Sequence, residues 1–135
     1  SRRAMEIAKE YVERRISFGE TLANHEGVQW MMGEVAMAIE VGRLLTMRAA
    51  WKLDQGDFAR KEVSMAKIQV ADTLHQAVDS AIQLNGARGY SKDTVLEWIY
   101  RYARQARLVD GASEVHKMVL ARNYFNEGND FWGWR

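Results

Sequence analysis

Apolar residues recur at helical spacing from Val28 to Trp51, and this stretch constrains the fold more than any other part of the chain. The repeating positions are Val28, Met31, Met32, Val35, Ile39, Gly42 and Leu45. A helix of this length carries one apolar stripe, which it buries only by packing against other secondary structure. The chain has no proline and is rich in Ala, Glu, Arg, Lys, Met and Leu, which favour helices. The sequence therefore predicts an all-α protein.

Further stretches show the same periodicity. Their apolar positions are Met5, Ala8, Val12 and Ile16; Met65, Ile68, Ala71, Leu74, Val78 and Ile82; and Val95, Leu96, Ile99 and Tyr102. We expect the first helix, after Ser1, to end near Gly19, and the helix of the second group to stop at Asn85-Gly86. Residues 20–27 and 85–89 are expected to be loops. A shorter helix is predicted from about Asp93 to Arg107, and a last one over residues 113–125. Short loops make long helices antiparallel, so we predict an up-and-down four-helix bundle with an additional short helix.

Composition narrows the class of protein. The length of 135 residues suits a single domain, and 47% apolar with 27% charged residues is typical of a globular chain. Nineteen basic and eighteen acidic residues nearly cancel, so composition does not favour a nucleic-acid or membrane-surface partner. No apolar run reaches the roughly 18 residues of a membrane span. The absence of cysteine excludes disulfides and thiolate chemistry and fits an intracellular protein.

The segment Leu108 to His116 contains the strongest candidate for chemistry. Asp110-Gly111 is a turn signal, and Ser113-Glu114 reads as the start of the last helix. The carboxylate of Asp110 is therefore expected to point out of a tight turn. From these residues alone, a plain helix cap remains the alternative to a catalytic role.

Three other patterns have both a functional and a structural interpretation. Asp72-x-x-His75 is a single, incomplete copy of the Glu-x-x-His pair of a di-iron bundle, so no metal site is predicted; His75 is expected to be a partly buried, hydrogen-bonded residue. The arginines Arg101, Arg104 and Arg107, with Arg88 and Lys92 upstream, suit either phosphate binding or a solvated face with ion pairs. Residues 85–89 either present backbone N–H groups to a pyrophosphate or only end a helix.

Together, four stretches resemble the C-terminal helical domain of the acyl-CoA dehydrogenases. They are YVERRISFG ending at Gly19, RAAWKLDQG ending at Gly56, QLNGARGY ending at Tyr90 and DGASEVHKMVLAR ending at Arg122. The family patterns are Y-x-x-x-R-x-x-F-G, R-A-A-W-x-x-D-x-G, Q-x-x-G-G-x-G-Y and E-G-T-S-E-I-Q-R. The resemblance covers residues 4–122 in order. It implies that residues 1–135 are a fragment of a longer protein whose N-terminal helical and middle β domains lie outside this chain. Such a domain alone is expected to be inactive.

The resemblance also implies roles for individual residues. In the family, FAD lies between this domain and the β domain, and a carboxylate at the position of Asp110 takes the α-proton of an acyl-CoA thioester. The β-hydride passes to the flavin. The matching cofactor-binding residues are Arg15, Ser17, Phe18, Glu26, Gln83, Leu84, Asn85, Gly86, Ala87, Ala112 and Ser113. Of these, Arg15 matches the arginine that contacts the FAD diphosphate of a neighbouring subunit. Some members carry the base on an upstream helix, which is an alternative to Asp110.

Several positions depart from the family pattern. Asp110 replaces a glutamate and is shorter by one methylene, about 1.5 Å of reach; the DG-x-x-EVH form resembles a branch, often joined to a kinase-like domain, that acts on 4-hydroxy or branched acyl-CoAs. Glu26 replaces an adenine-contacting glutamine, and Ala87 replaces a glycine. Tyr102 replaces an acid and removes an expected ion-pair partner of the neighbouring arginines, and Ala112 lacks the threonine hydroxyl.

The function implied by the resemblance is α,β-dehydrogenation of an acyl-CoA, with Asp110 as base and FAD as hydride acceptor. The implied partners are an electron-transferring flavoprotein and further copies of the chain, as a dimer of dimers. The implied location is cytoplasmic for a bacterial protein and mitochondrial for a eukaryotic one. Two alternatives remain: a family member that uses its flavin for an oxidase-type reaction, and a non-catalytic helical oligomerisation module that has lost FAD.

Overall fold

The computed structural model describes residues 1–133, and helices account for most of the chain. In chain order the elements are α1 (Arg2–Val12), β1 (Ile16–Ser17), β2 (Glu20–Thr21), the 3-10 turn η1 (Leu22–Asn24), α2 (Glu26–Asp54), α3 (Arg60–Asn85), α4 (Ala87–Tyr90), α5 (Leu96–Gln105), α6 (Ser113–Glu127) and the 3-10 turn η2 (Gly128–Trp132). The predicted all-α class is confirmed. Among residues 1–133, no helix combines the length and the apolar character needed to cross a membrane.

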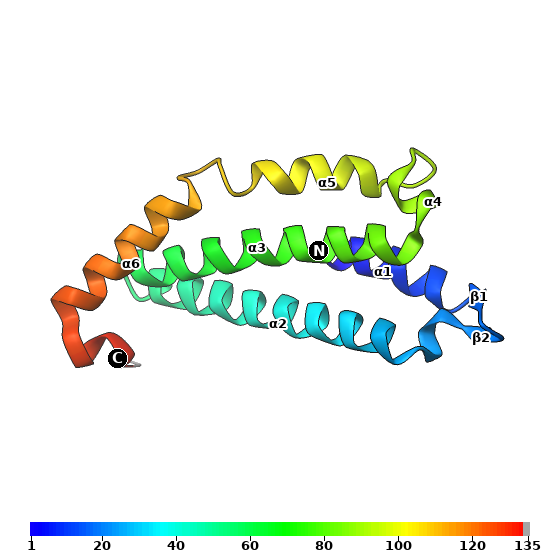
Figure 1. Ribbon diagram of the computed structural model, residues 1–135. Helices are drawn as coiled ribbons and strands as arrows, with labels where there is room; N and C mark the ends of the chain where they lie inside the picture. Colours follow the sequence, from blue (N-terminus) through cyan, green and yellow to red (C-terminus); the bar gives the residue numbers. More distant parts are fainter. Residues whose placement is uncertain (134–135) are drawn as a thin grey trace.

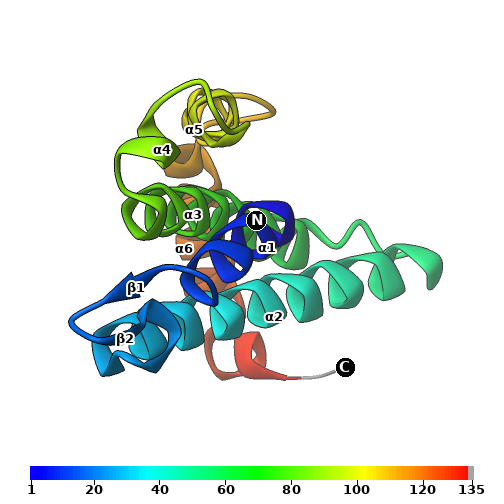
Figure 2. The same cartoon turned by 90° about the vertical axis from the view of Figure 1, so that its right-hand side faces the viewer.

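Helix α3 is the centre of the molecule, and α1, α2, α5 and α6 all pack against it. The directions of α1, α2, α3 and α5 alternate, whereas α6 crosses one end of this arrangement (Figure 1). Viewed from the end, α5 lies on one side of α3 and α2 on the other, with α1 beside α3 (Figure 2). Helix α3 therefore serves as the reference for describing the other helices.

The core between α1, α3 and α5 is built from alanine, valine and leucine side chains. Its fully or nearly fully buried members are Ala4, Ala8, Val12, Val78, Ala81, Leu84, Leu96 and Ala103. The α2–α3 contact likewise uses Val35, Gly42 and Ala49, three buried residues spaced seven apart on α2. A Cβ on Gly42 would lie 3.2 Å from a methyl group of Val70, so this glycine permits the close approach of the two helices.

The opposite face of α2 is apolar but exposed. Trp30, Met37, Leu44 and Trp51 also recur every seven residues, and each is more than half exposed. The predicted stripe at Val28, Met31, Met32, Val35 and Ile39 is buried or half-buried as expected. Helix α2 thus has two apolar faces, and α3 covers only one of them.

The prediction that the first helix continues to residues 16–19 is wrong. Helix α1 ends at Val12, and residues 16–21 form an antiparallel hairpin in which Ile16 pairs with Thr21 and Ser17 with Glu20. Phe18 and Gly19 have φ values of 53° and 87°, the geometry of a tight hairpin turn. Ile16 is consequently exposed rather than part of the core.

Other boundaries also differ from the predictions. Residues 20–27, expected to be a loop, contain strand β2, the 3-10 turn η1 and the first residues of α2. Helix α2 begins at Glu26 and ends at Asp54. The expected glycine loop contains the helical turn α4, and α5 starts at Leu96 instead of Asp93. Of the apolar tail residues, Phe131 is buried within this chain, where Lys61 donates to its carbonyl oxygen at 3.0 Å. Trp134 lies outside the described residues.

Candidate functional site

The predicted turn before the last helix is present and has an uncommon backbone conformation. Asp110 and Gly111 both have positive φ, 55° and 88°, and α6 begins at Ser113 as predicted. The N–H of Ser113 donates to the carbonyl of Arg107 at 3.1 Å, which closes the turn on the end of α5. An aspartate tolerates the left-handed region better than most residues. The turn therefore puts an acidic side chain at a site of backbone strain.

The interpretation of Asp110 as a helix cap is wrong. The capping position of α6 is occupied by Ala112, and no side chain caps this helix. Within residues 1–133, the Asp110 carboxylate has no hydrogen bond or ion pair. Its carboxylate is exposed and available to an external partner.

Asp110 lies at a groove of about 240 Å³ between α3 and the segment from α5 to the turn. The lining is mostly apolar and comprises Lys67, Val70, Ala71, Leu74, Tyr102, Gln105, Ala106, Val109 and Asp110. A carboxylate beside an apolar groove is an arrangement that suits proton abstraction from a largely apolar substrate. Tyr102, which departs from the family pattern, is part of this groove.

Two side chains of α6 fasten the turn to α3. The ring of His116 contacts the backbone carbonyl of Asp110 through Nε2 (3.2 Å) and the hydroxyl of Ser64 on α3 through Nδ1 (3.0 Å). Lys67 donates to the hydroxyl of the fully buried Ser113 at 3.4 Å. Sequence reasoning assigned no role to Ser64, Lys67 or His116, because nothing in the sequence places Ser64 and Lys67 opposite residues 113 and 116.

The hairpin collects the first group of predicted cofactor-binding residues. Phe18, at its tip, is 97% exposed, and Arg15 precedes it with an exposed side chain. Nε2 of His25 donates to the carbonyl of Ser17 at 3.1 Å and ties the hairpin to the start of α2, where Glu26 is exposed. An almost fully exposed aromatic ring on a turn held by a hydrogen bond can make an apolar contact with another molecule.

A pocket of about 290 Å³ connects this hairpin region with the α3–α4 junction. Arg14, Arg15, Arg88 and Asn85 all line it. Among the described residues, none of the three guanidinium groups makes a side-chain hydrogen bond or ion pair. Arginine matches phosphate oxygens in charge and geometry, so this set of donors fits a diphosphate. Arg14 was missed in the sequence, although it directly precedes Arg15.

Residues 83–87 are split between the surface and the core. Gln83, Gly86 and Ala87 are exposed, whereas Leu84 and Asn85 are buried. The side chain of Asn85 donates to the carbonyl of Ala81 at 2.8 Å. The N–H of Gly86 is used within the chain, donating to the carbonyl of Gln83 at 3.2 Å. This stretch both ends α3 and contributes Asn85 to the arginine-lined pocket.

The predicted site residues thus form two groups at different ends of α3. Lys67, beside the Asp110 turn, and Leu84, beside the arginine-lined pocket, are about 25 Å apart at roughly 1.5 Å per helical residue. Ala112 and Ser113 belong to the first group, and Arg15 with residues 83–87 belongs to the second (Figure 1).

The other sequence patterns have structural explanations. Arg101 pairs with Glu97 at 2.7 Å, and Arg107 with Asp72 at 3.5 Å, so these two arginines form ion pairs on the surface. For Arg101, Glu97 is the ion-pair partner that Tyr102 cannot be. His75 is half-buried against Tyr100, but the expected hydrogen bond is absent at its Nδ1. Within residues 1–133 no three His, Cys, Asp or Glu side chains are grouped to hold a metal.

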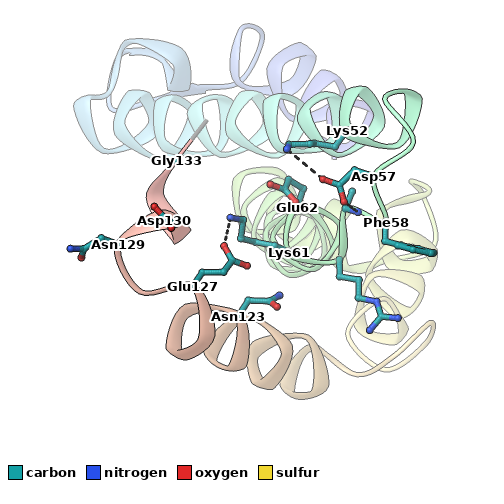
Figure 3. Close-up of a pocket in the computed structure, with 12 residues that line it drawn as sticks. Lys52, Asp57, Phe58, Lys61, Glu62, Asn123, Glu127, Asn129, Asp130 and Gly133 are labelled. Atoms are coloured by element: carbon teal, nitrogen blue, oxygen red, sulfur yellow. Dashed lines mark hydrogen bonds and ion pairs between the residues drawn. The ribbon is translucent and has the colours of Figure 1, made fainter. Parts of the chain in front are cut away.

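A charged pocket of about 620 Å³ lies where the ends of α2 and α6 meet the start of α3 (Figure 3). Lys61 pairs with Glu127 at 2.9 Å, and Lys52 with Asp57 at 3.4 Å. The backbone N–H of Ala59, and then Lys52, hold the pKa of the Asp57 carboxyl below its usual range. None of the predicted site residues lines this pocket.

The chain is similar to known proteins over most of its length. The sequence model for the family described as acyl-CoA dehydrogenase, C-terminal domain, matches residues 1–125. The chain is 36% identical over 119 residues to an acryloyl-CoA reductase (NADH) of Anaerotignum propionicum, covering 88% of this chain and 30% of that protein. It is 39% identical over 121 residues to acyl-CoA dehydrogenase family member 11 of Gallus gallus, covering 88% and 16%.

Among solved structures, the FAD complex of PigA superimposes with a TM-score of 0.88 at 26% identity. The match covers 94% of this chain and 33% of that one. The chain therefore spans about a third or less of the length of the proteins it matches.

Proposed function

This chain belongs to the acyl-CoA dehydrogenase family as a C-terminal domain, and on that premise we propose that its parent protein oxidises an acyl-CoA thioester at Cα and Cβ. Asp110 accepts the proton that leaves Cα. FAD, when bound, supplies the acceptor for the hydride that leaves Cβ. In the reverse direction the same carboxyl group returns a proton to Cα, so the residue assignment is independent of the direction of the reaction.

The observation that carries this proposal is the position of Asp110. Its carboxylate caps no helix and has no partner among residues 1–133, and Asp110 is one of the residues that line an apolar groove. A general base must come within about 2.6–3.2 Å of the proton that it removes. An acyl chain lying along Val70, Ala71 and Leu74 would bring its thioester end to this turn.

FAD is proposed as the cofactor because the second group of residues matches its chemistry. Arg15, with Arg14 and Arg88, offers unpaired guanidinium groups to the diphosphate. Phe18 offers a bare aromatic ring, and Gln83, Gly86 and Ala87 offer exposed surface beside the pocket. Glu26 lies at the start of α2, next to the hairpin. Leu84 and Asn85 are buried beneath the exposed residues of this stretch. The two groups are separated along α3, which supports the assignment of Arg15 to the cofactor of a neighbouring subunit.

The exposed stripe of α2, formed by Trp30, Met37, Leu44 and Trp51, supports self-association as a dimer of dimers. Monomeric proteins rarely expose contiguous apolar surface of this kind. A seven-residue repeat is the spacing that lets two helices pack along their lengths. We propose that a second copy of the chain covers this stripe.

We predict that the double substitution Met37→Glu and Leu44→Glu dissociates the parent protein to a smaller assembly. Each carboxylate would have to be buried unpaired in the interface, which is strongly unfavourable. Sedimentation velocity on the FAD-loaded protein measures the change. The control is the double substitution Gln76→Glu and Asn126→Glu, at exposed positions on α3 and α6 outside the stripe. An unchanged assembly in the stripe variant would remove α2 from the interface.

The proposed activity is tested on the intact parent protein, reconstituted with FAD and kept anaerobic. Saturated acyl-CoAs of increasing chain length and branching are titrated while the absorbance of oxidised flavin is recorded. We expect bleaching with at least one member of the panel, and the preferred member identifies the substrate class. Absence of flavin uptake would contradict the enzyme proposal and favour the oligomerisation module.

The electron acceptor distinguishes a dehydrogenase from a family member with an oxidase-type reaction. After bleaching, the reduced protein is mixed either with an electron-transferring flavoprotein or with air-saturated buffer. Rapid reoxidation by the flavoprotein and slow reoxidation by oxygen are expected for a dehydrogenase. The opposite order would assign the protein to an oxidase-type reaction.

A further inference from the structure

We propose that His116 is a positioning residue for Asp110, and that the hydrogen bond from its Nε2 to the Asp110 carbonyl aims the carboxylate at the substrate. The inference rests on the proposed function, since it gives a role relative to the base. It concerns a side chain that contacts neither substrate nor cofactor in the proposal and acts only through the turn.

The hydrogen bonds of His116 show which ring nitrogen carries a proton toward the turn. A backbone carbonyl can only accept, so the contact of 3.2 Å to the Asp110 oxygen requires the proton on Nε2. In the neutral ring, Nδ1 then carries the lone pair and accepts the hydroxyl hydrogen of Ser64 at 3.0 Å. Ser64 is buried on α3. The imidazole therefore links the turn to the most central helix of the molecule.

The turn depends on this link more than an ordinary turn would. Asp110 has a φ of 55°, a conformation that is unfavourable for a residue with a Cβ. The ring of His116 packs directly on the next residue: a Cβ on Gly111 would lie 2.9 Å from Nε2. The donor thus holds the 110–111 peptide plane. Fixing this plane restrains the rotation about the Cα–C bond of Asp110, which helps to set the direction of its Cα–Cβ bond.

The direction of that bond matters because the base is short. Aspartate has few rotatable bonds with which to correct a misplaced backbone, and proton transfer requires contact within about 2.6–3.2 Å. A misplacement of about 1 Å at a reacting group costs up to about 100-fold in rate. We therefore expect loss of the Nε2 donor to slow proton abstraction while substrate binding is preserved.

Two amide substitutions separate the two hydrogen bonds of His116. In His116→Gln the amide nitrogen reaches the place of Nε2, so the bond to Asp110 is kept and the bond to Ser64 is lost. In His116→Asn the shorter side chain reaches the place of Nδ1, so the bond to Ser64 is kept and the bond to Asp110 is lost. The two variants differ by one methylene and make a matched pair.

The measurement is the rate constant of flavin bleaching in stopped flow, with the intact FAD-loaded parent and its preferred acyl-CoA. We expect His116→Asn to be slower by about 10- to 100-fold and His116→Gln to stay within about 3-fold of the wild type. The acyl-CoA dissociation constant should change little in either. With α-deuterated acyl-CoA, the isotope effect should increase in His116→Asn only, because proton abstraction limits its rate more fully.

Equal rates in the two variants would overturn the inference, because a merely structural histidine loses a similar amount of support in both. If His116→Asn does not fold, His116→Phe provides the second variant: it keeps a ring in place but has no Nε2 donor, so bleaching should be slower by about 10- to 100-fold at unchanged flavin content. A wild-type rate in His116→Phe would overturn the inference. Asp110→Asn, measured alongside, tests the proposed function separately. A wild-type rate in that variant would contradict the base assignment itself.

Discussion

Replacing Asp110 with asparagine should lower the rate of flavin bleaching by the acyl-CoA substrate by about 100- to 10,000-fold, the range usually supplied by a positioned general base. The substitution keeps the size and the left-handed backbone of the residue, since asparagine also tolerates this conformation. It removes only the ability to accept a proton. Anaerobic stopped-flow absorbance of the intact protein measures the rate, and a parallel titration measures acyl-CoA binding.

Two comparisons make this result specific. Asp110→Glu retains a carboxylate and lengthens its reach by about 1.5 Å, so it should keep measurable bleaching where Asp110→Asn does not. Flavin content and acyl-CoA affinity should be the same in all three proteins. Equal bleaching by wild type and Asp110→Asn would instead place the base on a segment outside this chain.

Replacing Gly89 with alanine should destabilise the parent protein by about 3 kcal/mol, the upper end of the usual cost of overpacking. Gly89 is buried, and a Cβ there would lie 2.7 Å from the carbonyl oxygen of Ile82 and 2.9 Å from the Ile82 Cα. These are backbone atoms of α3, which cannot move without disturbing the central helix. The junction of α3 and α4 would be forced apart, and Asn85 and Arg88 would leave the arginine-lined pocket.

Chemical denaturation of the FAD-free protein measures this loss, and FAD affinity measured separately should fall as well. The control is Gly27→Ala, in the first turn of α2, where a Cβ meets no atom within 4 Å. That variant should stay within about 0.5 kcal/mol of the wild type, as is usual for a surface position. Similar stability of the Gly89→Ala and wild-type proteins would show that the junction adapts and that the close packing is not required.

The sequence alone predicted the helical architecture, because long helices carry their own signal. The periodicity of α2 and α3 and the absence of proline determine that these segments are helices, and short loops make them neighbours. The predicted ends of the helices were less accurate than the predicted helices themselves. The apolar spacing of Ile16 agrees equally with a continuing helix, and only the pairing of residues 16–21 turns this segment into a hairpin.

In the candidate site too, some features could be predicted from the sequence and others could not. The turn at Asp110-Gly111 and the start of α6 at Ser113 were predicted, since both depend on local residue preferences. The role of His116 was not, because the partner of its Nδ1 is Ser64, on a helix 52 residues away in the chain. Likewise, only the folded chain brings Arg14 and Arg88 to one pocket.

What the sequence determined by itself is therefore the family, the helices and the position of the carboxylate along the chain, all of which are encoded in short, contiguous patterns. What the tertiary structure decided is which groups meet: the apolar groove beside Asp110, the link through His116 to α3, and the unpaired guanidinium groups. It also showed that one apolar face of α2 is buried while the other is exposed. These features depend on contacts between distant residues, and a spacing pattern within one helix does not specify which surface of another helix it will face.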